Sequence, residues 1–276
     1  YTVAGTAPCP SATSTVTMSV VQAPDAGSGG PFSICASAAP IDPLTWLTGN
    51  PASGGTWTAP GGATIAQVDP ATASSGNYTY TVTGTPPCPN AQAVVQLTVD
   101  QPPDAGVDGI LNICLNGPST NMLPLLSGAQ AGGNWTGPFG ASNGTFEPGP
   151  DAPGTYTYSV NGSGACINEI DAATVTVTVH PLPQPSFTQD VNRGCVPLAV
   201  NFTNTTPGAL LNAGWIFGDG GLASTQDSAL HTYLSAGMRA VTLTVIHANG
   251  CTASITVDNA VLVSNGEGGS KQMRVG

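Results

Sequence analysis

Seven cysteines are the residues of this chain whose type and spacing most clearly allow chemistry. Six of them form three pairs of similar separation, which are Cys35 with Cys88, Cys114 with Cys166, and Cys195 with Cys251. No cysteine lies within a few positions of another, so the spacing does not favour a metal site. One equivalent pair per domain predicts three disulfides, each within a single domain, with buried free thiols as the alternative. Disulfides would place the chain outside the cytosol.

The seventh cysteine, Cys9, lies in a segment that has the pattern of the second half of a repeat. Within residues 1–22, Val16, Met18 and Val20 alternate with polar residues, which predicts a half-buried strand. We therefore expect Cys9 to be unpaired, or to pair with a cysteine outside the chain. We also expect the missing half of this sandwich to come from upstream sequence or from a neighbouring subunit.

An internal repeat positions the cysteines. The recurring motifs are Gly-Gly-Thr-Trp-Thr at 54–58 with Gly-Gly-Asn-Trp-Thr at 132–136, Pro-Asp-Ala-Gly at 24–27 and 103–106, and Tyr-Thr-Tyr at 78–80 and 156–158. A period of about 79 residues indicates one module copied along the chain. Short alternating strands with Gly- and Pro-rich turns predict immunoglobulin-type sandwiches, in which the tyrosine run is placed as a tyrosine corner.

These patterns predict an all-β chain of tandem immunoglobulin-like antiparallel β-sandwiches, arranged as a rod. The expected parts are 1–22 (late strands of a truncated repeat), 23–101 (repeat), 102–181 (repeat), 182–264 (a distinct last sandwich) and 265–276 (tail or linker).

Composition excludes several classes of partner. Only 7% of residues are charged and the net charge is −11, so nucleic acid and anionic membrane surfaces would be repelled. The sequence contains no run of 18 apolar residues, so we expect no membrane-spanning helix, and no signal peptide is visible.

The residues that could catalyse a reaction have simpler structural explanations. His231 is expected to hydrogen-bond a neighbouring turn, and Asp219, between two glycines, suits a tight turn capped by its own side chain. No second carboxylate has a determined place beside Asp219, and no nucleophile elbow is present. We therefore expect no catalytic residue, no metal, no cofactor and no enzymatic activity.

Two further sets of residues could bind ligands. Asp100, Asp104 and Asp108 cluster between the repeats, where oxygen ligands could hold calcium, although a solvated linker is the favoured interpretation. Exposed tryptophans could stack on sugars, and Trp46, which has no counterpart in the second repeat, is the strongest candidate, although a structural role is the favoured interpretation.

Trp57 and Trp135 follow glycine pairs that would let each indole fold into the core. We expect Trp135 to be mostly buried beside a Cys114–Cys166 disulfide, as in immunoglobulin-type sandwiches.

Residues 182–264 carry Trp215-Ile-Phe-Gly-Asp-Gly, His231-Thr-Tyr and an alternating strand at 241–245. This part resembles a polycystic-kidney-disease-type (PKD) domain, which implies another immunoglobulin-like sandwich. Ile216 and Met238 depart from the family's pattern, which weakens any ligand inferred from the family but not the fold.

The arrangement over residues 1–264 resembles the long surface adhesins of Bacteroidetes, including those tied to gliding motility. This resemblance implies export by the type IX system and a structural segment of an extracellular cell-surface adhesin or filament. It implies neighbouring copies or further repeats as partners, with surface glycans as a second class. Ser228, in Asp227-Ser-Ala229, resembles the short O-glycosylation site of such proteins. The alternative function is that of carbohydrate-binding accessory modules of a secreted polysaccharide-degrading enzyme.

Overall fold

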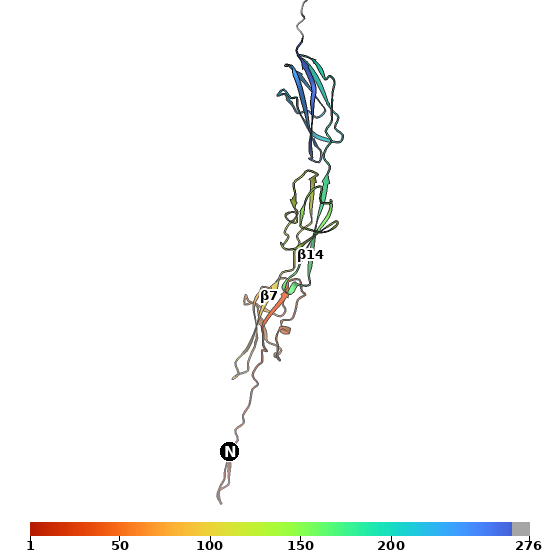
Figure 1. Cartoon of the computed structure of the whole chain (residues 1–276). Helices are drawn as coiled ribbons and strands as arrows, with labels where there is room; N and C mark the ends of the chain where they lie inside the picture. The colour runs from red at the N-terminus through yellow and green to blue at the C-terminus, as the bar shows by residue number, and fades with distance from the viewer. Residues whose placement is uncertain (267–276) are drawn as a thin grey trace, which may run out of the picture. The chain divides into compact units, whose positions relative to one another are not determined.

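The structure is a computed structural model that describes residues 1–266, so residues 267–276 of the predicted tail lie outside the described part. Figure 1 shows the whole chain coloured by residue number, with β7 and β14 labelled. The chain divides into two compact units. The first contains residues 1–105, 130–133 and 159–172, and the second contains residues 106–129, 134–158 and those from 173 onward. Regular structure in the described residues is β-strand apart from three short 3₁₀ turns, η1 (Pro43–Trp46), η2 (Leu123–Leu125) and η3 (Gly164–Cys166).

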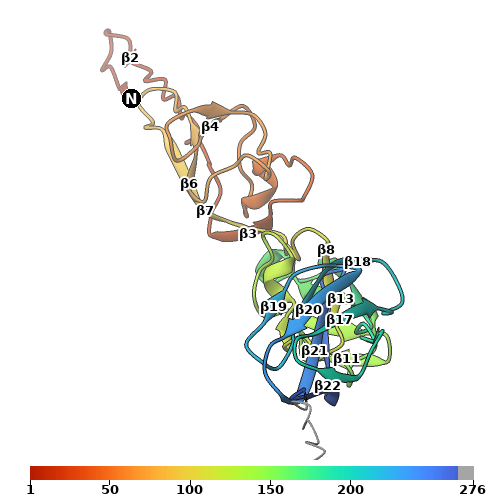
Figure 2. The same ribbon diagram turned by 90° about the horizontal axis from the view of Figure 1, so that it is seen from above.

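The first repeat folds around one five-stranded sheet with strand order β3-β7-β6-β4-β5. Its strands are β3 (Pro31–Cys35), β4 (Thr56–Thr58), β5 (Thr64–Ile65), β6 (Gly76–Val82) and β7 (Ala91–Asp100) (Figure 2). Buried residues alternate with half-buried ones in β6 and with exposed ones in most of β7, as expected for a strand with one face on the core. The first strand, β3, pairs with the last strand, β7, in parallel, whereas the other pairs are antiparallel.

The second repeat has the same plan, with strand order β11-β10-β13-β14-β8 and a small β12-β9 pair. Its strands are β8 (Gly109–Cys114), β9 (Thr120–Asn121), β10 (Asn134–Gly137), β11 (Gly140–Ser142), β12 (Thr145–Phe146), β13 (Gly154–Asn161) and β14 (Ile170–His180). Its first strand, β8, also runs parallel to its last strand, β14.

The last sandwich consists of a three-stranded sheet, β15-β17-β20, and a five-stranded sheet, β16-β22-β21-β18-β19. Its strands are β15 (Phe187–Gln189), β16 (Arg193–Cys195), β17 (Leu198–Asn204), β18 (Leu210–Ile216), β19 (Leu222–Ala223), β20 (Ser228–Tyr233), β21 (Gly237–His247) and β22 (Thr252–Ser264). Both sheets contribute to one core, which includes Phe202, Trp215 and Leu243. Again an early strand, here β16, pairs in parallel with the last strand, β22.

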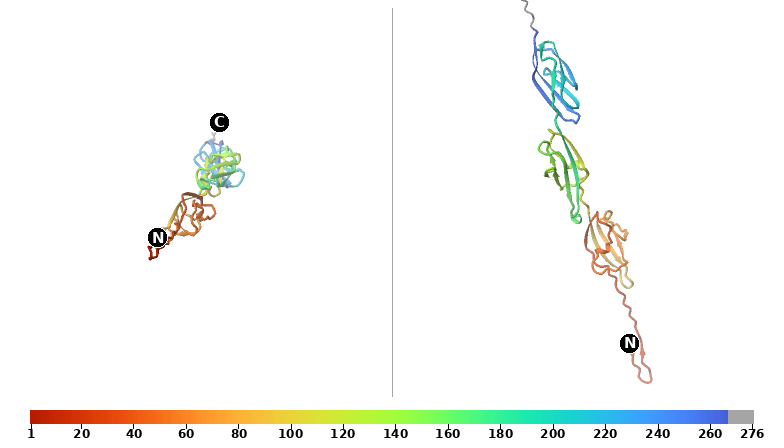
Figure 3. Two further views of the ribbon diagram at one scale, coloured as in Figure 1. Left: turned by 90° about the horizontal axis from the view of Figure 1, so that it is seen from below. Right: turned by 90° about the vertical axis from the view of Figure 1, so that its right-hand side faces the viewer.

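Residues 1–22 form only a small hairpin of β1 (Thr2–Val3) and β2 (Ala12–Thr13). The strand predicted around Val16, Met18 and Val20 is absent, and these side chains are 84–89% exposed. The prediction of a half-buried strand was wrong because no neighbouring strand pairs with this stretch (Figure 3). The prediction of an all-β chain of tandem immunoglobulin-like sandwiches is confirmed.

Candidate functional site

Residues 1–266 contain two disulfides, and both differ from the predicted ones. Cys35 is bonded to Cys166, and Cys114 is bonded to Cys251. Their Cα atoms lie 5.0 and 5.7 Å apart, within the range that a disulfide requires. The predictions of Cys35–Cys88, Cys114–Cys166 and Cys195–Cys251 disulfides were therefore wrong. Each bond instead joins one module of the series to the module that follows it in sequence.

The parallel pairing of the early strand explains why the predicted bonds cannot form. Cys35, at the end of β3, lies opposite Asp100, the last residue of β7, whereas Cys88 precedes the first residue of β7. A ten-residue strand spans about 30 Å, far beyond the roughly 7 Å limit for Cα atoms of a disulfide. The two cysteines of one module thus lie at opposite ends of its last strand.

The same separation holds in the other two sandwiches. Cys114 lies opposite His180 at the end of β14, and Cys195 lies opposite Ser264 at the end of β22. Cys166 and Cys251 instead lie in the hairpins that precede β14 and β22. We call Cys35, Cys114 and Cys195 the strand-end cysteines, and Cys9, Cys88, Cys166 and Cys251 the hairpin cysteines.

The residue opposite each strand-end cysteine is where the chain leaves the sandwich, and we call it the exit residue. The backbone N–H that follows the cysteine donates to the carbonyl of the exit residue in every case. The pairs are Ala36 N to Asp100 O at 2.8 Å, Leu115 N to His180 O at 3.0 Å, and Val196 N to Ser264 O at 3.1 Å. This hydrogen bond fixes each strand-end cysteine beside the exit of its own module.

Asp100, the exit residue of the first repeat, contacts the second repeat beside the Cys35–Cys166 disulfide. Its carboxylate accepts a hydrogen bond from the backbone N–H of Ala165 at 2.7 Å, and its carbonyl lies 3.5 Å from the sulfur of Cys166. On the other side, the hydroxyl of Ser37 donates to the carboxylate of Glu169. Hydrogen bonds therefore accompany the covalent bond where the β13–β14 hairpin contacts the exit of the first repeat.

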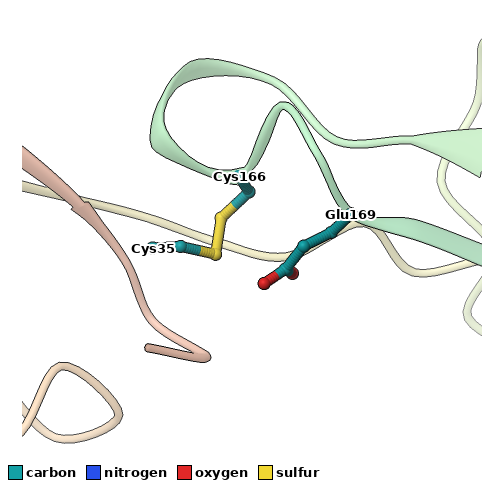
Figure 4. Close-up of side chains that lie close together, drawn as sticks. All are labelled: Cys35, Cys166 and Glu169. Carbon is teal, nitrogen blue, oxygen red and sulfur yellow. A yellow bond between two sulfur atoms is a disulfide. The ribbon is translucent and has the colours of Figure 1, made fainter. Parts of the chain in front are cut away.

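Figure 4 shows the carboxylate of Glu169 beside the Cys35–Cys166 disulfide. Within residues 1–266, these three residues are the one group whose potential ligand atoms could share a metal ion. The thiolate form of cysteine is the metal ligand, and both sulfurs here are bonded to each other. This cluster is therefore part of the bridge between the modules and not a metal centre.

The carboxylates between the repeats are engaged with the backbone. Asp108 accepts from the N–H of Thr174 at 2.7 Å, and Asp171 accepts from the N–H of Ala105 at 2.7 Å. Asp100, as described above, accepts from Ala165. This favours the structural interpretation of the acidic cluster over a calcium site, because the carboxylates bind separate backbone groups.

The tryptophans with sugar-binding potential are buried. Trp46, Trp57 and Trp135 are 7%, 4% and 8% exposed, respectively. Trp46 stacks on Phe32 with ring centroids 5.0 Å apart, which agrees with the favoured structural interpretation and not with the alternative of an exposed sugar platform. Trp135 is buried as predicted, but it packs on Tyr158 at 5.0 Å, and the disulfide expected beside it does not exist.

The tyrosine corners are present in both repeats. The hydroxyl of Tyr78 donates to the carbonyl of Ser74 at 3.1 Å, and that of Tyr156 donates to the carbonyl of Ala152 at 2.9 Å. Burial raises the pKa of both phenols. This confirms the placement of the repeated Tyr-Thr-Tyr run.

His231 and Asp219 form a structural pair. Their side chains lie 2.9 Å apart, and the imidazole stacks on Phe217 with centroids 4.2 Å apart. Asp219 also accepts from the N–H of Gly221 at 3.0 Å, as a turn-capping side chain does. Burial alone would raise the pKa of Asp219, but the hydrogen bonds from His231 and Gly221 outweigh it and lower the pKa. The predicted turn role of both residues is confirmed.

Three cysteines are not bonded to another cysteine of the described residues. Cys9 and Cys195 are exposed, and Cys88 is partly exposed. Ser228, the predicted O-glycosylation site, is exposed at the start of β20.

Residues 178–263 match the sequence profile of the PKD domain family. No curated protein sequence matches the chain. Among solved structures, the PKD1 domain of the Vibrio cholerae metalloprotease PrtV is 25% identical, with a TM-score of 0.26, over 30% of this chain and 99% of that one. The PKD1 domain of Vibrio anguillarum Epp is 28% identical, with a TM-score of 0.26, over 30% and 96%.

Immunoglobulin domains 1–5 of Sidekick-1 align with 90% of this chain and 60% of that one, at 14% identity and a TM-score of 0.35. The strand order shows a series of sandwiches of immunoglobulin-like fold. The last of them contains the residues that match the PKD domain family, 178–263, and is called the PKD domain below.

Proposed function

We propose that the chain is a non-enzymatic structural segment of an extracellular cell-surface adhesin or filament. The observation that carries this proposal is the pair of bonds Cys35–Cys166 and Cys114–Cys251, which join successive sandwiches covalently. Disulfides of this kind persist in oxidising compartments outside the cytosol. The part of the chain that the structure describes contains no helix that could span a membrane.

The two bonds interleave, and this limits how far the chain can be extended. Without them, the 216-residue stretch from Cys35 to Cys251 could reach about 730 Å. With them, the shortest covalent path from Cys35 passes through the first disulfide to Cys166. It then follows the backbone back to Cys114 and passes through the second disulfide to Cys251. That path contains only the 52-residue stretch between Cys114 and Cys166, which reaches about 180 Å. Such a segment would therefore extend little under tension even when a module unfolds.

The test uses intact source cells and an antibody raised against the folded chain. Labelled cells in immunoelectron microscopy, together with weaker surface attachment or loss of a filament when residues 23–264 are deleted in frame, would support the proposal. Intracellular labelling, or deletion with unchanged attachment and unchanged filaments, would contradict it. Hydrolysis of a polysaccharide by the purified chain would contradict its non-enzymatic part, and binding on a glycan array would favour accessory carbohydrate-binding modules.

A further inference from the structure

The cysteines follow one rule along the series of modules. The strand-end cysteine of a module bonds to the hairpin cysteine of the next module, as Cys35 does to Cys166 and Cys114 does to Cys251. The 102–181 repeat is bonded at both of its cysteines, whereas Cys88 and Cys195 have no partner in the described residues. Cys88 stands at the hairpin position, and Cys195 stands at the strand-end position. In the bonded modules, these two positions form the disulfides.

Cys88 has the local geometry of a bonded hairpin cysteine. Its sulfur lies 3.7 Å from the carbonyl of Val21, as the sulfur of Cys166 lies 3.5 Å from the carbonyl of Asp100. By the repeat alignment, Val21 is the counterpart of Asp100, the exit residue of the preceding module. Cys88 is therefore placed where a strand-end cysteine opposite Val21 would meet it.

The hairpins themselves are also alike. The N–H of Cys88 donates to Thr85 O at 2.9 Å, and that of Cys166 donates to Ser163 O at 3.0 Å. Each turn packs on a glycine, Gly84 or Gly162, where an added Cβ would approach the turn backbone to within 2.3 and 1.9 Å, respectively. The first repeat thus preserves the turn that presents the bonded cysteine in the second.

Cys195 has the geometry of a bonded strand-end cysteine. It lies opposite exit residue Ser264, and the next N–H, that of Val196, donates to the Ser264 carbonyl, as at the two bonded positions. Unlike buried Cys35, it is exposed. Cys35 is bonded to Cys166, a hairpin cysteine of the following module.

We propose that Cys88 and Cys195 are half-cystines that join this segment covalently to further modules of the same kind. Cys88 would accept a strand-end cysteine and Cys195 a hairpin cysteine. The inference rests on the proposed structural function and names its partner. The chemistry is the same whether that module belongs to the same polypeptide or to a second copy.

Bond formation requires an oxidant, which we take to be a disulfide-bearing thiol oxidase. One thiolate attacks a sulfur of the oxidant's disulfide and displaces a thiolate, giving a mixed disulfide. The partner thiolate then attacks the sulfur of Cys88 or Cys195 in that intermediate. Two thiols are oxidised to one disulfide, and the oxidant leaves as a dithiol with the two electrons and two protons.

The test is a disulfide map of the native protein from its source cells. Cells are quenched in acid, free thiols are alkylated with N-ethylmaleimide, and unreduced protein is digested with pepsin, because four Lys and Arg residues give trypsin few sites. We expect Cys88 and Cys195 peptides to be unalkylated and linked to cysteine peptides from other modules. A partner peptide outside residues 1–276 but encoded by the same gene identifies the same polypeptide, and a partner within them identifies a second copy.

A matched pair of variants tests the assignment at Cys195. Cys195→Ser should expose the partner's hairpin cysteine to alkylation, whereas Asn192→Ser, at an exposed position on the same edge, should leave it bonded. Alkylated Cys88 or Cys195 in the wild type, or a small thiol such as glutathione bonded to either, would overturn the proposal. The proposed function itself fails in the labelling and deletion experiment, so the two failures can be told apart.

Discussion

The 102–181 repeat and the PKD domain carry cysteines at the same two structural positions but in different states. In the repeat, strand-end Cys114 and hairpin Cys166 are both bonded to neighbouring modules. In the PKD domain, hairpin Cys251 is bonded and fully buried, whereas strand-end Cys195 is an exposed thiol. The comparison teaches that the state of a cysteine here depends on the adjacent module and not on the core of its own sandwich.

The two domains also stabilise their cores differently. The PKD core stacks Trp215, Phe217 and His231, and the indole N–H of Trp215 donates to the carbonyl of Thr225 at 3.2 Å. The repeat relies on Trp135 against Tyr158 and on the corner formed by Tyr156. These aromatic contacts do not involve the bonded cysteines, so the aromatic packing and the disulfides can be changed separately.

The largest effect is expected from breaking both bonds. A Cys35→Ser/Cys114→Ser chain should extend about 550 Å further in single-molecule pulling once all modules have unfolded. Because the bonds interleave, Cys35→Ser alone leaves a 79-residue path to Cys114 and should add only about 90 Å. Cys114→Ser alone leaves an 85-residue path from Cys166 to Cys251 and should add about 110 Å. Additive increments near 180 Å per variant would instead indicate bonds within modules.

Truncating the core tryptophans should give the next largest effect. Trp215→Ala and Trp135→Ala should each lower the free energy of unfolding by about 3–5 kcal/mol, because both side chains are buried. Trp215→Ala should be the more costly, since it also leaves the Thr225 carbonyl without its indole donor. Urea titration followed by circular dichroism measures both, with Phe139→Ala, at a 93% exposed position, as the control. A loss below about 1 kcal/mol for either variant would contradict the core assignment.

Removing a corner hydroxyl should have a smaller effect. Tyr156→Phe deletes the hydrogen bond to the carbonyl of Ala152 and keeps the ring, so we expect a loss of about 1 kcal/mol. Tyr1→Phe, at a 90% exposed position, is the matched control. Equal stability of the Tyr156 variant and wild type in urea titration would show that the corner adds nothing to stability.

The smallest effect concerns pH and is specific to the PKD domain. The pKa of Asp219 is lowered from its ordinary value of 3.8, so the unfolded chain binds this proton more readily than the folded chain. The associated stability should be complete above pH 3.8 and should be lost as the pH falls through the lowered pKa. Asp219→Asn should flatten this part of the profile, whereas Asp258→Asn, at an exposed position, should not. An unchanged profile in Asp219→Asn would exclude this contribution.

The sequence was sufficient to predict the fold class, the tyrosine corners and the buried Trp135. These features depend on alternation and on motif order, which are local. The disulfides were mispredicted because equal spacing of cysteines does not reveal that β3 and β8 run parallel to the last strand of their module. That register places the two cysteines of one module at opposite ends.

The exposure of residues 16–20 and the contacts between modules also could not be predicted from local sequence patterns. Val16, Met18 and Val20 alternate as Val95, Leu97 and Val99 do, yet the former are exposed, because burial requires a partner strand. The roles of Asp100 and Glu169 arise from contacts between modules, and no motif in either segment marks them.

The central claim, that disulfides join successive modules, is tested most directly by a disulfide map of the 276-residue chain after oxidative folding. Alkylated, unreduced protein is digested with pepsin, and linked peptides are sequenced by mass spectrometry. We predict Cys35 linked to Cys166 and Cys114 linked to Cys251. Peptides that link Cys35 to Cys88 and Cys114 to Cys166 would contradict the account.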